Sequence, residues 1–253
     1  MCGIVAYVGK RNAATILIDG LRSLEYRGYD SAGVYLPQYG LVRAVGPVNN
    51  LATKLGTGGN DTSGISHTRW ATNGVPSEIN AHPHSDELGN IWIVHNGIIE
   101  NYKELKDELS LLGYRFFSET DSEVVAHLIA HKLKQTKSLE EAVNQAIREL
   151  KGTYGLAILN KSEPGKIVAA RMGSPLVIGL GDGENFIASD PTPILRHTKN
   201  VIYLNDGEMA VVTADSHSIF TIDNARVERA PDVIEWSIED VQKGGYEHFM
   251  LKE

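Results

Sequence analysis

The nine residues MCGIVAYVG (1–9) decide how this chain folds. They place the only cysteine among 253 residues, Cys2, between the initial methionine and an apolar run. Cysteine serves either as a small buried residue or as a reactive one. If Met1 is removed, the thiol and a free α-amine share one residue, and an amine with a pKa of ~7.7–8.0 can act as general base for a nucleophile. From position alone, a nucleophile and a small buried residue at the start of a strand are equally open.

Composition excludes several classes of protein. The formal charge is −8, from 24 Lys and Arg against 32 Asp and Glu, which argues against a nucleic-acid-binding surface. No apolar stretch approaches ~18 residues, so we expect no membrane span. The start does not resemble a signal peptide, because Lys10 and Arg11 follow a short apolar run. A lone cysteine cannot form an internal disulfide, which fits a reducing compartment, so we expect a cytoplasmic protein.

Short β-type runs dominate the chain, and Gly, Pro, Asn and Asp separate them. The runs lie at 3–9, 31–36, 41–45, 63–71, 90–94, 153–159, 166–171, 175–180, 201–204 and 208–213. Strands, then helices, then more strands indicate an α+β layered fold rather than βαβ alternation. No linker or internal repeat divides residues 1–253, so we expect one domain.

Helix starts can be read from capping residues that precede apolar residues at helical spacing. Three such starts are present: Asn12 before the stripe 16–24, the capping box Thr120-x-x-Glu123 before 124–133, and the capping box Ser138-x-x-Glu141 before 139–150.

The pair Asn96-Gly97, in HNGII (95–99), has two interpretations. Asn-Gly between apolar runs is a strong signal for a tight hairpin turn. The same pair offers a side-chain amide and a backbone N–H, which together could form an oxyanion hole. The two interpretations are compatible, because a tight turn can expose a backbone N–H.

Charged residues suggest how a small zwitterion could be bound. Arg69 ends a β-run in SHTRWATNG (66–74), where an arginine can grip a carboxylate with two hydrogen bonds. A lone arginine is more often a solvated surface residue. Asp121 falls in the first turn of the helix predicted after Thr120, where the helix dipole alone favours an acid.

Two further patterns predict no cofactor and no metal. His67, His95 and the histidines of NAHPH (80–84) lack cysteines or carboxylates at ligand spacing, so we expect no zinc site. The glycines of GLGDG (179–183) precede a strand-like segment instead of a helix, which predicts a hairpin turn rather than a nucleotide loop.

Taken in order, the motifs carry a resemblance that covers the whole chain. They are Cys2-Gly3-Ile4, LEYRGYDSAG (24–33), HTRWAT (67–72), NAHPH (80–84), HNGIIEN (95–101), TDSEV (120–124) and EHFMLKE (247–253). With them the chain resembles the glutaminase (class II glutamine amidotransferase) domain of the glucosamine-6-phosphate synthases, also called glutamine–fructose-6-phosphate aminotransferases (isomerizing). Related class II enzymes tend to have His-Arg-Gly where this chain has Tyr26-Arg27-Gly28.

The resemblance implies a fold and a catalytic set. The fold would be a four-layer αββα sandwich of the N-terminal-nucleophile hydrolase type. Cys2 would attack the side-chain amide of L-glutamine, with its own α-amine relaying the proton. Asn96 and Gly97 would hold the oxyanion, and Arg27 would help to position the cysteine.

The resemblance also implies how the substrate is held. Arg69 and Thr72 would grip the α-carboxylate of glutamine or glutamate, and Asp121 its α-ammonium group. Trp70 would stand at the start of an ammonia passage. Asn73 would be a further substrate-binding residue. Many of these synthases have a histidine there, in TRWATHG, whereas Asn73 can donate a hydrogen bond but cannot become charged.

For the longer protein, the resemblance implies that EHFMLKE (247–253) leads into a sugar-isomerase domain beyond residue 253. That domain would bind fructose 6-phosphate, and the full-length enzyme would be a homodimer. The chain itself would need no cofactor, no metal, no nucleic acid and no membrane.

Two other functions stay open. The chain could be an N-terminal-nucleophile hydrolase of other amides, such as a penicillin or bile-salt acylase, or a module that has lost activity and senses glutamine. Arg69 and Asp121 discriminate, because a zwitterionic amino acid needs both charges matched and an acyl amide does not.

Overall fold

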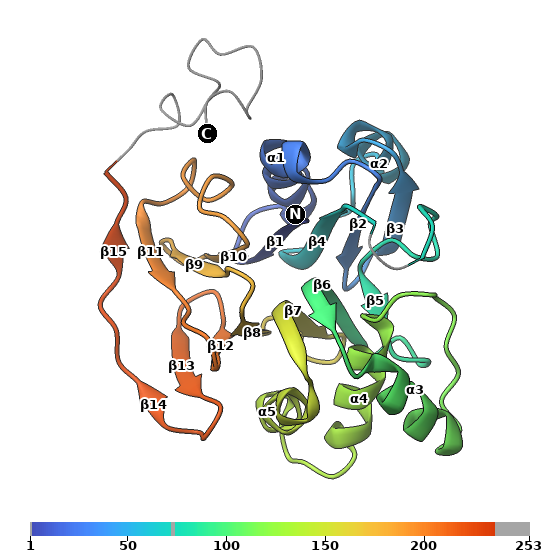
Figure 1. The fold of residues 1–253 in the computed structure, drawn as a ribbon. Coiled ribbons are helices and arrows are strands. Elements are labelled where there is room, and N and C mark those ends of the chain that lie inside the picture. Colours follow the sequence, from blue (N-terminus) through green and yellow to red (C-terminus); the bar gives the residue numbers. More distant parts are fainter. Residues whose placement is uncertain (1, 72–73, 236–253) are drawn as a thin grey trace.

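The chain folds around two antiparallel β-sheets in a computed structural model, which describes residues 2–71 and 74–235 (Figure 1). Within these ranges one sheet has eight strands, in the order β15 (Asp232–Val233), β11 (Asn200–Tyr203), β9 (Val177–Leu180), β10 (Asn185–Ala188), β1 (Gly3–Val8), β4 (Ser63–Arg69), β2 (Ser31–Leu36) and β3 (Gly40–Val45). The other has seven, in the order β14 (Arg226–Val227), β13 (His217–Thr221), β12 (Glu208–Val212), β8 (Ile167–Met172), β7 (Gly152–Asn160), β6 (Ile91–Ile99) and β5 (His84–Ser85).

Helices cover the outer face of each sheet, so that the molecule has four layers (Figure 1). Helices α1 (Ala13–Leu24) and α2 (Val48–Leu55) pack on the eight-stranded sheet, and a short 3₁₀ turn, η1 (Glu25–Arg27), follows α1. Helices α3 (Tyr102–Leu111), α4 (Glu123–Leu133) and α5 (Leu139–Glu149) pack on the seven-stranded sheet. A third apolar core fills the space between the sheets. The predicted αββα sandwich of the N-terminal-nucleophile type is confirmed.

Most local predictions hold. Each run predicted as a strand is one, and 179–183 is the predicted hairpin turn between β9 and β10. The Asn12 side chain caps α1 by accepting a hydrogen bond from Thr15 N at 3.1 Å. Ser138 Oγ caps α5 in the same way, accepting from Glu141 N at 3.3 Å.

Two local predictions are wrong. Thr120 does not cap a helix: α4 begins at Glu123, and Ser122 before it makes no side-chain capping bond. Asn96 and Gly97 do not form a hairpin turn, because β6 runs straight through them and pairs with β7 along its length. The helices α2 and α3 were not predicted. In the structure Pro47 and Asn101, the residues before them, make no side-chain capping hydrogen bond.

Strand alternation places the chemically interesting side chains between the sheets. Ile4 of β1, Ile65 of β4 and Val94 of β6 all belong to the core between the sheets. Because side chains of a strand alternate between its faces, residues two or four positions along point to the same side. That side therefore receives Cys2, and also His67, Arg69 and Asn96. The inter-sheet core is apolar in its middle and polar at this end.

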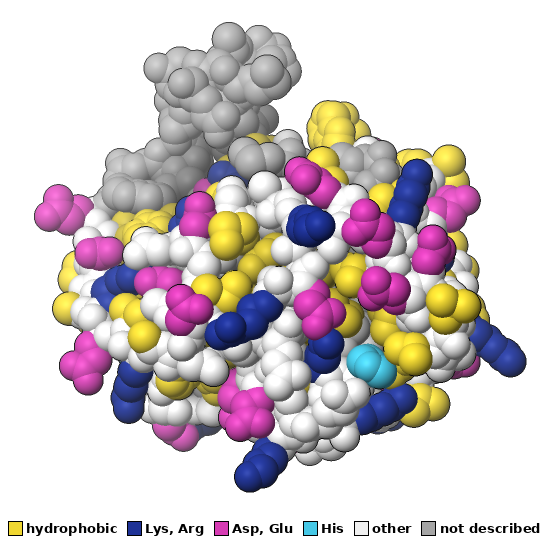
Figure 2. All heavy atoms as spheres, turned by 60° about the horizontal axis from the view of Figure 1, so that its bottom comes forward, with side chains coloured by type: hydrophobic (Ala, Val, Ile, Leu, Met, Phe, Trp, Pro, Cys, Tyr) yellow, Lys and Arg dark blue, Asp and Glu magenta, His cyan; other side chains and the backbone are white. Residues whose placement is uncertain are grey.

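The surface carries mixed charge. Figure 2 shows acidic and basic side chains interspersed over the face that α3, α4 and α5 cover in Figure 1. Within the described ranges, no helix combines the length and the apolar character needed to cross a bilayer.

The Ser138 cap gives a test of the fold. Ser138→Ala leaves the Glu141 N–H without its acceptor, so the free energy of unfolding should fall by about 1 kcal/mol. Ser138→Gly should cost only a few tenths of a kcal/mol, because glycine is a tolerated cap. Urea denaturation measures both values. A Ser138→Ala variant with the same free energy of unfolding as the unsubstituted chain would mean that the hydroxyl does not act as a cap.

Candidate active site

A cavity of about 310 Å³ opens at the polar end of the inter-sheet core. It is lined by Cys2, Arg27, Arg69, Trp70, His82, His95, Asn96, Gly97, Thr120, Asp121, Ser122, Ser174, Pro175 and Ser189. Seven of the nine residues predicted for the site are therefore together, although they come from distant parts of the sequence. The other two, Thr72 and Asn73, lie outside the described residues.

The Cys2 thiol lies against the backbone of Trp70. Trp70 N donates a hydrogen bond to Sγ at 3.2 Å, and Sγ lies 3.6 Å from Trp70 O. Burial raises the pKa of the thiol, while the hydrogen bond from Trp70 N favours the thiolate and opposes that rise. Gly3 lets the strand pack here, because a Cβ would lie 2.7 Å from Thr68 Oγ1 and 2.8 Å from Leu24 Cβ. The thiol is thus fixed in place but needs a base to become a nucleophile.

Asn96 and Gly97, on β6, line the same cavity as the Cys2 thiol. Asn96 Nδ2 donates to Cys2 O at 3.0 Å, which connects β6 to the residue before β1. Gly97 has a φ of +128°, and a Cβ at this position would lie 2.1 Å from Thr153 O. Only glycine fits such a backbone. In the Asn-Gly pair, Gly97 therefore allows a backbone conformation in β6, at the edge of the cavity, that other residues rarely adopt.

Arg69 and Asp121 bring opposite charges into the same cavity. Both residues are only 4% exposed. Arg69 Nη2 donates to Gly74 O at 3.2 Å. Burial lowers the pKa of Arg69, and the neighbouring Cys2, Asp30 and Asp121 act in the opposite direction. Two carboxylates near the guanidinium reduce the cost of burying it.

Asp121 was expected in the first turn of a helix, and this is wrong: it lies two residues before α4. Its Oδ2 accepts a hydrogen bond from Ile99 N at 2.8 Å, at the end of β6. This bond orients the carboxylate, and among the described residues it engages only one of the two oxygens.

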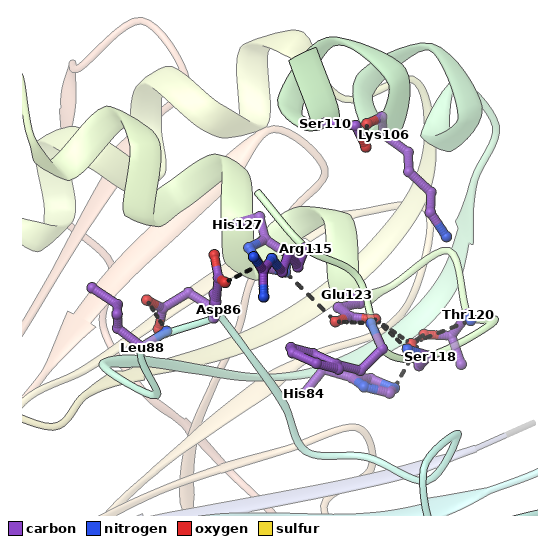
Figure 3. A network of polar contacts seen from close by, with 12 residues as sticks. His84, Asp86, Leu88, Lys106, Ser110, Arg115, Ser118, Thr120, Glu123 and His127 are labelled. Atoms are coloured by element: carbon purple, nitrogen blue, oxygen red, sulfur yellow. Dashed lines mark hydrogen bonds and ion pairs between the residues drawn. The ribbon is translucent and has the colours of Figure 1, made fainter. Parts of the chain in front are cut away.

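Glu123 anchors the segment that carries Asp121 (Figure 3). Its carboxylate accepts hydrogen bonds from Phe117 N at 2.9 Å, Ser118 N at 2.6 Å and Ser118 Oγ at 2.7 Å. Burial by itself would raise the pKa of Glu123, but His127, Ser118 and Phe117 stabilise the carboxylate and lower the pKa to about 2. The segment before α4 is therefore tied to a buried charge.

The hydrogen bonds beyond Glu123 have a fixed direction. Since Ser118 Oγ donates to the carboxylate, it accepts from Thr120 Oγ1 at 3.0 Å. Thr120 Oγ1 in turn accepts from His84 Nε2 at 3.1 Å. Figure 3 shows this row of side chains from His84 to Glu123. The row fixes Thr120, which lines the cavity beside Asp121.

Arg27 and Trp70 also line the cavity. Arg27 Nη2 donates to Asp190 Oδ2 at 2.5 Å, and its Nε donates to Tyr26 Oη at 2.9 Å. Trp70 is 47% exposed and meets the Tyr29 ring edge-on, with 5.6 Å between the ring centroids.

Sequence reasoning missed the structural role of four histidines. His67, His82, His84 and His95 are buried, and the His67 and His82 rings stack with 4.2 Å between centroids. Burial lowers the pKa of all four, that of His67 to about 3. In the described ranges no three His, Cys, Asp or Glu side chains are grouped to hold a metal ion. The alternation of His67 with Arg69 along β4 was the available signal that His67 faces the site.

A four-layer sandwich with the cysteine at the end of its inter-sheet core is the fold of N-terminal-nucleophile amidotransferases. The structure superposes on glutamine phosphoribosylpyrophosphate amidotransferase from B. subtilis with a TM-score of 0.73 and 24% identity, over 87% of this chain and 49% of that one. A glutamine aminotransferase class-II domain protein from Silicibacter pomeroyi gives a TM-score of 0.56 and 19% identity, over 91% of this chain and 100% of that one. These similarities establish the fold.

The sequence comparisons identify the family. The glutamine amidotransferase domain family matches residues 67–196, and the chain belongs to this family. It is 53% identical to the glutamine–fructose-6-phosphate aminotransferase (isomerizing) of Chlorobaculum tepidum and 49% identical to that of Methanosarcina acetivorans. Each match covers 100% of this chain but only 42% and 43% of the relative. The chain therefore spans less than half the length of these relatives.

The buried histidines predict acid sensitivity. In the folded state burial keeps the pKa of each of these histidines low, whereas in the unfolded state the side chain titrates near pH ~6.5. Below that pH the unfolded state binds more protons, so the free energy of unfolding falls as the pH falls, by up to about 1.4 kcal/mol per pH unit for each histidine. Urea titrations between pH 7.5 and 5.5 measure this slope.

Substituting one of the four buried histidines should lower the slope of the free energy of unfolding against pH by the contribution of about one proton. His67→Gln tests this, and His217→Gln, on β13 outside the cluster, is the matched control. A slope that His67→Gln leaves unchanged would show that His67 is not held neutral.

Proposed function

We propose that this chain hydrolyses L-glutamine to glutamate and ammonia, with Cys2 as the nucleophile. The observation that carries the proposal is the shared cavity: it joins the thiol, the Asn96-Gly97 pair and the buried charges of Arg69 and Asp121. Membership of the glutamine amidotransferase domain family supports the same reaction.

The reaction needs one base, one nucleophile and an oxyanion site. Once Met1 is removed, the α-amine of Cys2 takes the thiol proton, and Sγ attacks the amide carbon of glutamine. The oxyanion of the tetrahedral intermediate accepts hydrogen bonds from Asn96 Nδ2 and Gly97 N. The C–N bond then breaks, ammonia leaves with the proton from the amine, and a thioester remains. Water, activated by the same amine, hydrolyses the thioester and regenerates the thiol.

The charges of the cavity favour glutamine over other amides. Arg69 would bind the α-carboxylate, together with the predicted contacts from Thr72 and Asn73. The Asp121 oxygen that Ile99 N leaves unused would bind the α-ammonium group. An acylase for penicillins or bile salts needs neither charge in this arrangement. A glutamine sensor would need the charges but not an aligned thiol and oxyanion site.

For the longer protein we propose the activity that the relatives' names state, glutamine–fructose-6-phosphate aminotransferase (isomerizing). Residues 1–253 would be its glutaminase domain. A sugar-isomerase domain after residue 253 would bind fructose 6-phosphate and receive the ammonia past Trp70, while Arg27 would help to position Cys2. The full-length enzyme would be a cytoplasmic homodimer that needs no metal or cofactor for this half of its chemistry.

Replacing the nucleophile tests the reaction. Cys2→Ser keeps the α-amine but supplies a much poorer nucleophile, so glutamate formation should nearly vanish. A diazoketone analogue of glutamine should add one equivalent to Cys2 of the unmodified chain. Undiminished turnover in the serine variant, or labelling at another residue, would remove Cys2 from the mechanism.

Replacing the charges tests the substrate. Arg69→Lys should raise the KM for glutamine, because lysine cannot form the two-pronged contact with a carboxylate. Asp121→Asn should raise the KM as well, since it removes the charge that faces the ammonium group. The unmodified chain should reject amides that lack either the α-carboxylate or the α-amine. Equal hydrolysis of such truncated amides would favour a general acylase.

A further inference from the structure

His67 lies directly behind the oxyanion site, in a position that the reaction does not explain. The residue is on β4 in one sheet, and its ring reaches β6 in the other sheet. His67 Nε2 lies 3.0 Å from Asn96 Oδ1 and 3.1 Å from His95 O. The ring is 1% exposed, so no water competes for these contacts.

The protonation state of His67 follows from its neighbours. Asn96 Nδ2 faces Cys2 O, which can only accept, so the amide oxygen must face His67. Both atoms near His67 Nε2 are then acceptors, and Nε2 must carry the proton. His67 Nδ1 has no hydrogen-bond partner among the described residues. Burial lowers the pKa of His67 to about 3, so the ring is neutral and donates through Nε2 alone.

This contact determines which way the Asn96 amide points. If the amide rotated by half a turn, its oxygen would face Cys2 O and its nitrogen would face His67 Nε2–H. Two acceptors would then meet on one side and two donors on the other. With His67 in place, both N–H groups of Asn96 stay on the side of Cys2, where a developing negative charge needs them.

We propose that His67 is a positioning residue for the reaction. Its Nε2–H holds the side-chain amide of Asn96 so that the N–H groups of this amide face the carbonyl oxygen of the substrate amide. This rests on the proposed role of Cys2 and Asn96 in glutamine hydrolysis. His67 does not act as acid or base, since its proton is shared between two acceptors on β6. A second histidine supports the same region, because His82 Nδ1 accepts from His95 N at 3.3 Å.

The test uses substitutions that keep or remove the donor at the place of Nε2. His67→Gln can place its amide nitrogen near the position of Nε2, whereas the shorter His67→Asn reaches only the position of Nδ1. His67→Met fills the volume with no donor. Asn144→Leu is the matched control. Asn144 lies on α5, and its side chain is another buried donor to a backbone carbonyl, that of Ile222.

We expect His67→Met and His67→Asn to lower kcat for glutamine hydrolysis by about 10- to 100-fold, as misplacement of a catalytic group does. KM should change by less than a factor of about three. His67→Gln should retain most of kcat. Asn144→Leu should lower the melting temperature and leave kcat unchanged. If His67→Met fails to fold, the difference in kcat between His67→Gln and His67→Asn still tests the positioning role.

Coupling to Asn96 separates this proposal from the proposed function. In an Asn96→Ala background, His67→Asn should cause no further loss of kcat, because its effect passes through the Asn96 amide. A multiplicative further loss, or a normal kcat for His67→Asn in the unsubstituted chain, would overturn the positioning role. If Asn96→Ala itself leaves kcat unchanged, or the unmodified chain does not hydrolyse glutamine, the proposed function fails instead.

Discussion

The hydrogen bond from Asn96 Nδ2 to Cys2 O, 3.0 Å long, joins the two sheets where their shared core ends. Further inside, Ile4, Ile65 and Val94 exclude water and fix the distance between the sheets. The same spacing between the sheets applies to the polar residues at the end of these strands. Positions of the thiol and of the oxyanion donor are thus set by the packing of an apolar core, not by a flexible loop.

Burial makes the site chemically selective but costly. A buried polar group destabilises the fold unless it is hydrogen-bonded, and a buried charge does so unless it is paired. The site meets this cost with neutral histidines, with carboxylates near Arg69, and with the hydrogen bonds that Glu123 accepts from Phe117 and Ser118. A buried donor such as the Asn96 amide, 9% exposed, acts more strongly on a developing charge than it would in water.

Much of this could be predicted from the sequence. The alternation of β-runs, the caps at Asn12 and Ser138, and the motif order led to the layered fold. The errors have a common physical cause. Asn96-Gly97 has the local preference of a turn, but pairing with β7 over the whole of β6 overrides it.

The prediction that Thr120 caps α4 is wrong for a related reason. Its hydroxyl is recruited by Ser118 and His84 from outside the helix, so it cannot cap α4. From the sequence, the histidines could be tested only as metal ligands, and their spacing argued against that. Their stacking depends on which strands the fold brings together. Tertiary contacts of this kind are not encoded in local spacing.

The central claim is that Cys2, with a free α-amine, attacks glutamine. Intact-mass and peptide mass spectrometry of the chain, quenched in acid during turnover, tests it most directly. We predict a chain that begins at Cys2 and carries a γ-glutamyl thioester on that residue. A fully active chain that retains Met1, or a glutamyl group on any other side chain, would contradict it.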